Sequence, residues 1–188
     1  MIAVISLTLV LASATGMSHS HPCWIRDDPA DLELRISRLD SATTTLGQDT
    51  LTVCYSRPRV LGRPIIGRVV PFGEPWRLGA NEATTLTVSA PVLFGDVRLL
   101  PGSYSLYAVP ERHEWRVIVN GAVRRWGIPI DGTVRAQDLG ATTAPVEELT
   151  ESVEEFRIRF EPTGREAVDL VIEWDRTRVR VPVRQAPA

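Results

Sequence analysis

The chain has 188 residues, enough for one ordinary domain, and its 44% hydrophobic and 23% charged residues are typical of a globular protein. Its formal net charge of −2 disfavours a general nucleic-acid binder. All 21 basic residues are arginine, which excludes a Schiff-base lysine, a lysine general base and a P-loop lysine.

The N-terminal residues are typical of an export signal. Residues 2–12 form an uncharged apolar run that is too short to span a bilayer, and the small residues 12–14 (ASA) follow it as a signal-peptidase pattern. We therefore expect a signal peptide over 1–14, a tail over 15–30 and a periplasmic or extracellular location. No basic residue precedes the run, and a buried first strand is the alternative. No later stretch approaches 18 apolar residues, so we expect no membrane span.

The two cysteines of the chain are Cys23 and Cys54. In an oxidising compartment they indicate one disulfide between the tail and the body, and two free cysteines are the alternative. The residues His21 and Pro22 do not resemble the small aliphatic stretch before an acylated cysteine, which disfavours a lipoprotein. His19, His21 and Cys23 alternate and suit a soft metal, but the sequence offers no fourth ligand, so we expect no metal and no cofactor.

Most of the remaining chain alternates between apolar and polar residues, the pattern of half-buried antiparallel strands. Turns containing glycine and proline separate these runs. The sequence therefore predicts one all-β domain over residues 31–185, an antiparallel β-sandwich of jelly-roll type. Only Val146, Leu149 and Val153 match a helical spacing, and they predict one short helix. The alternating runs lie at 32–36, 51–55, 84–88, 104–108, 115–119, 156–160, 168–174 and 179–183.

The segment from Arg57 to Arg77 does not alternate. Its four prolines and three glycines cannot lie in a central strand. We expect a long, ordered arm over residues 57–82 that packs on one face of the sandwich, and long connections of this kind are often functional. The segment carries five arginines and one glutamate, whereas residues 131–155 carry seven acidic residues and one arginine.

The most specific motif of the chain runs through the arm into the following strand, at Tyr55, Arg57, Pro58, Gly62, Arg63, Val70, Pro71, Gly73, Trp76, Arg77, Gly79, Ala80, Asn81, Glu82, Ala83 and Thr84. This pattern resembles the bacterial family catalogued as domain of unknown function 2911 (DUF2911), over roughly Leu34 to Val183. The resemblance implies an exported, β-rich domain with no established activity. Phe72 stands where the family usually has tyrosine, and Ile130 stands where we expect tyrosine before Asp131, so neither hydroxyl is needed here.

The candidate site centres on Glu82 and the arginines of the arm. Guanidinium groups bind carboxylate, phosphate or sulfate through paired hydrogen bonds, while amide and carboxyl groups orient hydroxyls and aromatic rings supply an apolar wall. This set predicts a pocket for a small anionic or sugar-like ligand. The expected ligand-binding residues are Arg57, Arg63, Arg77, Asn81, Tyr55, Trp76, Tyr107 and Trp126.

Three functions remain open at this point. The first is a binding or structural module with this pocket, and the second is an envelope protein–protein interaction module. The third is an enzyme in which Glu82 is a base or metal ligand and Arg77, Arg63 and Arg57 bind an anionic substrate. A Ser-His-Asp or Cys-His enzyme is disfavoured because the body has one histidine, His113, in a turn. In each case we expect Glu82 and Arg77 to share a network at the base of the arm with one of the other two arginines.

Overall fold

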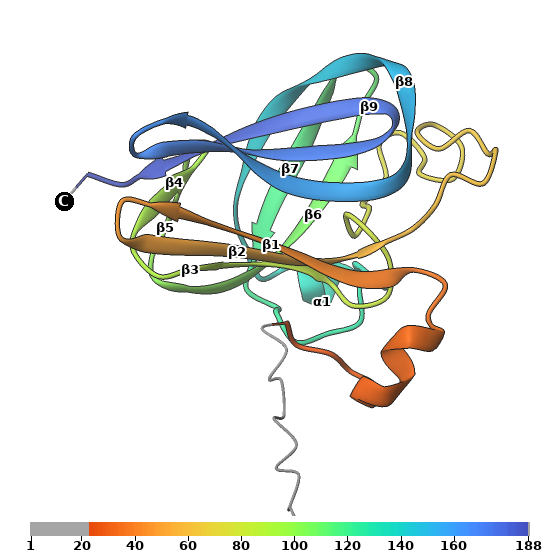
Figure 1. Ribbon diagram of the computed structural model, residues 1–188, viewed down its shortest axis with the longest axis horizontal. Helices are drawn as coiled ribbons and strands as arrows, with labels where there is room; N and C mark the ends of the chain where they lie inside the picture. The colour runs from red at the N-terminus through yellow and green to blue at the C-terminus, as the bar shows by residue number, and fades with distance from the viewer. Residues whose placement is uncertain (1–22, 188) are drawn as a thin grey trace, which may run out of the picture.

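The computed structural model describes residues 23–187, so the expected signal peptide and both histidines before Cys23 lie outside the described residues. Figure 1 shows two layers of antiparallel strands, which confirms the predicted all-β sandwich. The strands are β1 (Arg38–Leu46), β2 (Asp49–Arg57), β3 (Thr84–Val88), β4 (Val92–Phe94), β5 (Val97–Leu99), β6 (Gly102–Pro110), β7 (Glu114–Asn120), β8 (Asp138–Gly164) and β9 (Ala167–Gln185). A 3-10 helix, η1 (Pro29–Leu34), and a short helix, α1 (Gly132–Arg135), complete the structure. Within residues 23–187, neither helix is long and apolar enough to cross a membrane.

The two layers are joined by one long strand. Neighbouring strands follow the order β1-β2-β3-β6-β7-β8-β9-β4-β5. The first part of β8 pairs with β7 and its second part pairs with β9, so β8 passes from one layer to the other. Inward-facing side chains of both layers, such as Leu51, Leu86, Val117 and Ile172, are fully buried and form the core between the layers.

Strand β9 joins two alternating runs that the sequence separated. The residues of β9 that belong to the core cluster are even-numbered from Val168 to Trp174 and odd-numbered from Val179 to Val183. Asp175 lies between the two runs with a φ of 52°, a left-handed conformation that shifts the alternation. Arg157 and Arg159 of β8 and Arg178 of β9 surround the fully buried Glu173 at 2.6–3.2 Å.

The predicted strand at 32–36 is wrong. Most of this run belongs to η1, and Leu34 and Ile36 are 81% and 88% exposed. The side chain of Asp28 accepts a hydrogen bond from the Ala30 backbone, and Pro29 stands at the start of the turn. These capping signals outweigh the short alternation, and the first strand begins at Arg38.

The predicted short helix at Val146, Leu149 and Val153 is also wrong. These residues lie in β8, where Val146 pairs with Val179 of β9 and Val153 pairs with Asp175. The pairing register shifts twice in this part of β8, so the spacing of the apolar residues is irregular there. An isolated helix of this length gains little in water, whereas β9 offers a long paired partner.

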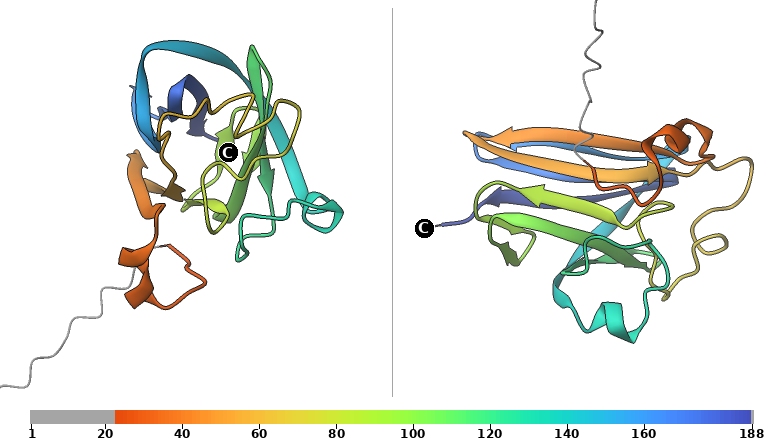
Figure 2. Two further views of the ribbon diagram at one scale, coloured as in Figure 1. Left: turned by 90° about the vertical axis from the view of Figure 1, so that its right-hand side faces the viewer. Right: turned by 90° about the horizontal axis from the view of Figure 1, so that it is seen from below.

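The arm lies across one end of the sandwich, next to the ends of β2 and β6 (Figures 1 and 2). Ile65 and Val70 of the arm are 1% and 3% exposed and join the core cluster. Trp76 exchanges two backbone hydrogen bonds with Ala108 of β6, at 2.7 and 2.8 Å. At the base of the arm, Arg59 lies 3.5 Å from Glu154, which belongs to the acidic segment. The arm is therefore an ordered part of the domain.

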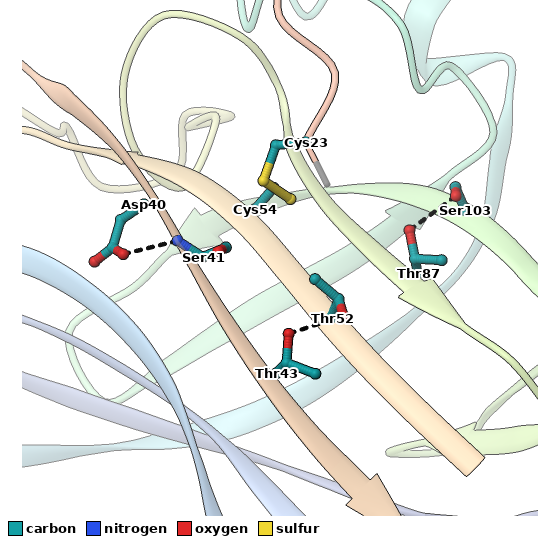
Figure 3. Close-up of a disulfide and its surroundings, with 8 residues drawn as sticks. All are labelled: Cys23, Asp40, Ser41, Thr43, Thr52, Cys54, Thr87 and Ser103. Carbon is teal, nitrogen blue, oxygen red and sulfur yellow. Dashed lines mark hydrogen bonds between the residues drawn. A yellow bond between two sulfur atoms is a disulfide. The ribbon is translucent and has the colours of Figure 1, made fainter. Parts of the chain in front are cut away.

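The N-terminal segment from Cys23 to Ser37 is attached to the outside of the sheet at its start, whereas η1 has no buried residue. Cys23 and Cys54 form a disulfide with a Cα–Cα distance of 5.6 Å, as Figure 3 shows. Cys54 occupies an outward-facing position of β2 and is only 7% exposed. The disulfide thus fixes the start of this segment beside β2, before it continues through η1 into β1.

Candidate functional site

A cavity of about 360 Å³ lies beneath the arm, and we call it the arm pocket. Two arginines of the arm, Arg63 and Arg77, line it together with the aromatic side chains of Trp76 and Trp174. The remaining lining residues are small or apolar: Ser37, Pro58, Val69, Val70, Pro75, Gly79, Ala80 and Ile128. Aspartate and glutamate are absent from the described lining, so the arginines supply the charge of the arm pocket.

The chain holds Arg77 in place through unusual local backbone. The next residue, Leu78, is fully buried with a φ of 52°, and its carbonyl accepts a hydrogen bond of 2.5 Å from the Thr84 hydroxyl. Gly79 has a φ of 141°, and its carbonyl accepts a hydrogen bond of 3.3 Å from Nε of Arg77. A Cβ atom at Gly127 would lie 2.4 Å from Cδ of Arg77. Strained backbone of this kind often marks a functional site.

Both arginines of the arm pocket lack an acidic partner among residues 23–187. Arg63 donates to the carbonyl oxygens of Val60 and Arg59 at 3.1 and 2.8 Å. Partial burial lowers the pKa of the Arg77 guanidinium, because desolvation disfavours its charged form. Arginine nevertheless stays protonated. Two positive charges therefore face one cavity, and the described part of the chain does not neutralise them.

Aromatic rings form one wall of the arm pocket. The rings of Trp76 and Trp174 are stacked, with centroids 5.6 Å apart and an interplanar angle of 16°. Phe156 and Trp115 pack edge-on against Trp76. Trp174 is 2% exposed, and its Nε1–H has no hydrogen-bond partner among the described residues. The sequence predicted Trp76 for the site. Trp174 ends the alternating run 168–174 and is a core residue, as that alternation indicates, and it also lines the arm pocket.

Glu82 lies outside the arm pocket, and its expected network with Arg77 is wrong. Its carboxylate accepts hydrogen bonds from both terminal nitrogens of Arg35, at 2.8 Å each, and from the Arg26 backbone at 3.0 Å. Burial raises the pKa of Glu82, but these hydrogen bonds outweigh burial and the net pKa is lowered. The Arg26 guanidinium also lies 5.4 Å from the ring of Trp126. Glu82 and Trp126 therefore anchor the N-terminal segment.

The cavity beside Glu82 has a volume of only about 10 Å³. Such a volume is just enough for one water molecule, so a substrate does not reach the carboxylate in this conformation. No sequence pattern indicated Arg35 as the partner of Glu82, because Arg35 lies on the polar side of the strand expected at 32–36. The proline-initiated turn at Asp28 and Pro29 was the available signal against that strand.

Arg57 and Asn81 also lie outside the arm pocket. Arg57 forms ion pairs with Asp40, at 3.3 Å, and with Glu155 at the base of the arm. The Asn81 amide donates to the Ser37 carbonyl at 2.9 Å and thereby joins the arm to the start of β1. Asn81 has a φ of 57°, a conformation that asparagine tolerates well. Both side chains are used to hold chain segments together.

The two predicted tyrosines are buried in other parts of the sandwich. Tyr55 donates to Asp40 at 3.1 Å and Tyr107 donates to Asp138 at 2.7 Å. Burial raises the pKa of both phenols, that of Tyr107 to about 12. Neither lines the arm pocket. Of the eight expected ligand-binding residues, the structure brings together three in the arm pocket: Arg63, Arg77 and Trp76.

A second cavity of about 370 Å³ lies on another side of the arm and is lined by both acidic and basic side chains, Glu111, Arg112, Glu148 and Arg176 among them. His113 lines this cavity and is exposed. Across residues 23–187, no group of three or more His, Cys, Asp or Glu side chains is placed to hold a metal ion. The arm pocket differs from this second cavity because its described lining carries arginine but no acidic side chain.

The fold and the arm pocket together define a β-sandwich domain with a long arm folded over a cationic, aromatic cavity. The chain belongs to the family described as "Protein of unknown function (DUF2911)", whose model matches residues 37–183. This match includes both layers of the sandwich and the whole arm. No curated protein and no solved structure matches the chain.

Proposed function

We propose that this protein is an exported binding domain whose arm pocket holds a small anion. The observation that carries the proposal is the pair Arg63 and Arg77, which line one cavity without a carboxylate among the described residues. Arg63 is exposed and Arg77 is half-buried. Burial of a charged group without a partner is costly, so the Arg77 guanidinium favours a counter-charge. A bound anion supplies the missing negative charge. The pocket volume of about 360 Å³ is typical of small-molecule sites.

The lining also suggests the kind of anion. Guanidinium groups recognise carboxylate, phosphate and sulfate through paired N–H donors. Trp76 adds an apolar face next to these donors, and the small residues Gly79 and Ala80 leave space for a ligand. A small organic anion with a ring or an apolar part satisfies both features better than a bare inorganic ion.

A thermal-shift screen tests the anion proposal. The screen uses phosphate, sulfate and small mono- and dicarboxylates, including aromatic and sugar acids. At about 100 times Kd, a ligand stabilises the protein by about 2.7 kcal/mol, a rise in Tm of several degrees. We expect Arg77→Gln to abolish this rise. The control is Arg68→Gln, because Arg68 lies on the same arm, is exposed and does not line the pocket.

Two results would contradict the anion proposal. One is a screen in which no anion raises Tm, which would favour the envelope interaction module. The other is an equal loss of the response in Arg77→Gln and Arg68→Gln, which would show a nonspecific charge effect. Glu82→Gln separates the enzyme hypothesis from the anion proposal: we expect it to lower Tm and to leave the rise with the anion intact, because Glu82 lies outside the arm pocket.

The proposal of export is supported by two features. The sequence begins with an apolar run followed by a cleavage pattern, and the Cys23–Cys54 disulfide is typical of oxidising compartments. N-terminal sequencing of the native protein tests this. We expect the mature chain to begin between residues 15 and 23, so that Cys23 is retained. A chain that begins at Met1 or Ile2 would contradict export through this signal.

A further inference from the structure

The outer face of β1, β2, β3 and β6 is covered with hydroxyl groups. The register places Thr43 opposite Thr52, Thr52 opposite Thr87, and Thr87 opposite Ser103, so these four side chains form one row across four strands. A hydrogen bond of 3.0 Å connects Thr43 with Thr52, and one of 2.8 Å connects Thr87 with Ser103 (Figure 3). Ser41, Thr45, Thr50 and Thr85 occupy the same face by register.

A groove of about 610 Å³ lies over the part of this hydroxyl face that β3 and β6 form. Its floor is formed by Thr85, Thr87 and Ser103, from the two neighbouring strands β3 and β6. Cys23 and Trp24 line it from the N-terminal segment. Gly121, Val123 and Arg124, which follow β7, complete the lining.

The composition of the groove indicates an uncharged ligand. Among the described lining residues, Arg124 is the only one with a formal charge. Hydroxyl groups both donate and accept hydrogen bonds, as the hydroxyls of a sugar do. A tryptophan ring offers a flat apolar surface for the C–H face of a sugar ring. The arm pocket also has tryptophan rings, but it is lined by two arginines, and Ser37 is the only hydroxyl residue in its described lining.

We propose that this groove binds a neutral oligosaccharide. Thr85, Thr87 and Ser103 hydrogen-bond the sugar hydroxyls, and Trp24 packs against the apolar face of a sugar ring. A volume of about 610 Å³ lies within the usual range of ligand sites and accommodates more than one sugar unit. The site is separate from the arm pocket and independent of the proposed anion.

The disulfide takes part in this site. Trp24 directly follows Cys23, and the Cys23–Cys54 bond fixes that point of the chain to β2. β2 pairs with β3, which supplies Thr85 and Thr87, so the bond sets the position of the Trp24 wall over the hydroxyl floor. Loss of the disulfide leaves Thr85, Thr87 and Ser103 in place but removes the covalent link that positions Trp24. We therefore expect the double variant Cys23→Ala/Cys54→Ala to bind the sugar more weakly than the wild type.

A calorimetric titration with neutral oligosaccharides tests the groove. The probes are the pentaoses of cellulose, chitin, xylan, laminarin and starch, each added to the full mature protein. We expect at least one to bind, with a loss of about tenfold or more in affinity for Thr87→Val and for Trp24→Ala. The matched control is Thr43→Val, which removes a hydroxyl from the same face and the same kind of cross-strand hydrogen bond, but outside the groove.

The proposal would be overturned if none of the five pentaoses bound. It would also be overturned if Thr87→Val and Thr43→Val changed the affinity equally, because the groove would then play no special part. Arg77→Gln separates the two sites: it should abolish the response to anions and leave the affinity for the oligosaccharide unchanged. A simultaneous loss of both would contradict two independent sites. Circular dichroism of each variant checks that the sandwich has folded.

Discussion

Replacement of Arg35 by methionine leaves Glu82 buried without its cation. The side chains of Arg35 and Glu82 are 9% and 5% exposed, and both terminal nitrogens of the guanidinium contact the carboxylate at 2.8 Å. Removal of one partner from a buried ion pair costs about 3–5 kcal/mol, because the other charge stays in the interior. For a domain of this length, 1 kcal/mol changes Tm by about 2–4 °C. We therefore expect Tm to fall by about 10 °C in calorimetric unfolding at pH 7.

The exposed pair of Arg59 and Glu154 provides the control for this substitution. Their side chains are 49% and 48% exposed and 3.5 Å apart, so Arg59→Met should cost less than about 1 kcal/mol. Addition of Glu82→Gln to Arg35→Met should restore part of the stability, because the buried charge is then removed. Equal losses of Tm in Arg35→Met and Arg59→Met would refute a buried, stabilising pair.

The deficit of Arg35→Met should depend on pH with a defined sign. Removal of Arg35 takes away the strongest contribution that lowers the pKa of Glu82 and leaves burial, which raises it, so the pKa of Glu82 is higher in the variant than in the wild type. The penalty for the buried charge is then complete above this higher pKa and is lost as pH falls through it. The difference in Tm between wild type and Arg35→Met should therefore shrink between pH 7 and pH 5, whereas that of Arg59→Met should stay small throughout.

Two further predictions concern acid and reduction. Arginine hydrogen bonds outweigh the burial of Glu173 and lower its pKa to about 2, so its contribution to stability is complete above about pH 4.5 and is lost as pH falls to 2. Glu173→Gln should therefore unfold at a lower temperature than wild type at pH 7, with the gap closing by pH 2; a constant gap in acid calorimetry would contradict this. The Cys23–Cys54 bond closes a sequence separation of 31 residues and is worth about 3–4 kcal/mol. Its reduction should lower Cm in urea unfolding without abolishing the fold, and an unchanged Cm would contradict this contribution.

Hydrophobic alternation predicted most of the fold, and the predictions that were wrong have local causes. Runs such as 51–55 and 84–88 became strands because their apolar side faces the core and their polar side faces solvent. The run at 32–36 has the same pattern, but its apolar side chains meet no core and a capped turn takes over. The helical spacing at 146–155 failed because β8 changes partner there, which shifts the register.

The residues of the candidate site could be predicted from the sequence only where they lie close together along the chain. Trp76 and Arg77 are adjacent, and Arg63 lies on the same arm, so a local motif indicated all three. Trp174 reaches the arm pocket from β9, and its alternation indicated only its position in the core. Arg35 meets Glu82 across 47 residues, through a segment whose path depends on η1 and the disulfide. Such contacts depend on tertiary packing and have no local signal.

The anion proposal places a ligand between Arg63 and Arg77 in the arm pocket. Its most direct test is a crystal structure of the protein with the anion that gives the largest rise in Tm, in parallel with Arg77→Gln crystals grown under the same conditions. We expect electron density for the anion within hydrogen-bond distance of both guanidinium groups in the wild type and an unoccupied arm pocket in the variant. Density for the anion elsewhere on the surface, or the same occupancy of the arm pocket in both crystals, would contradict it.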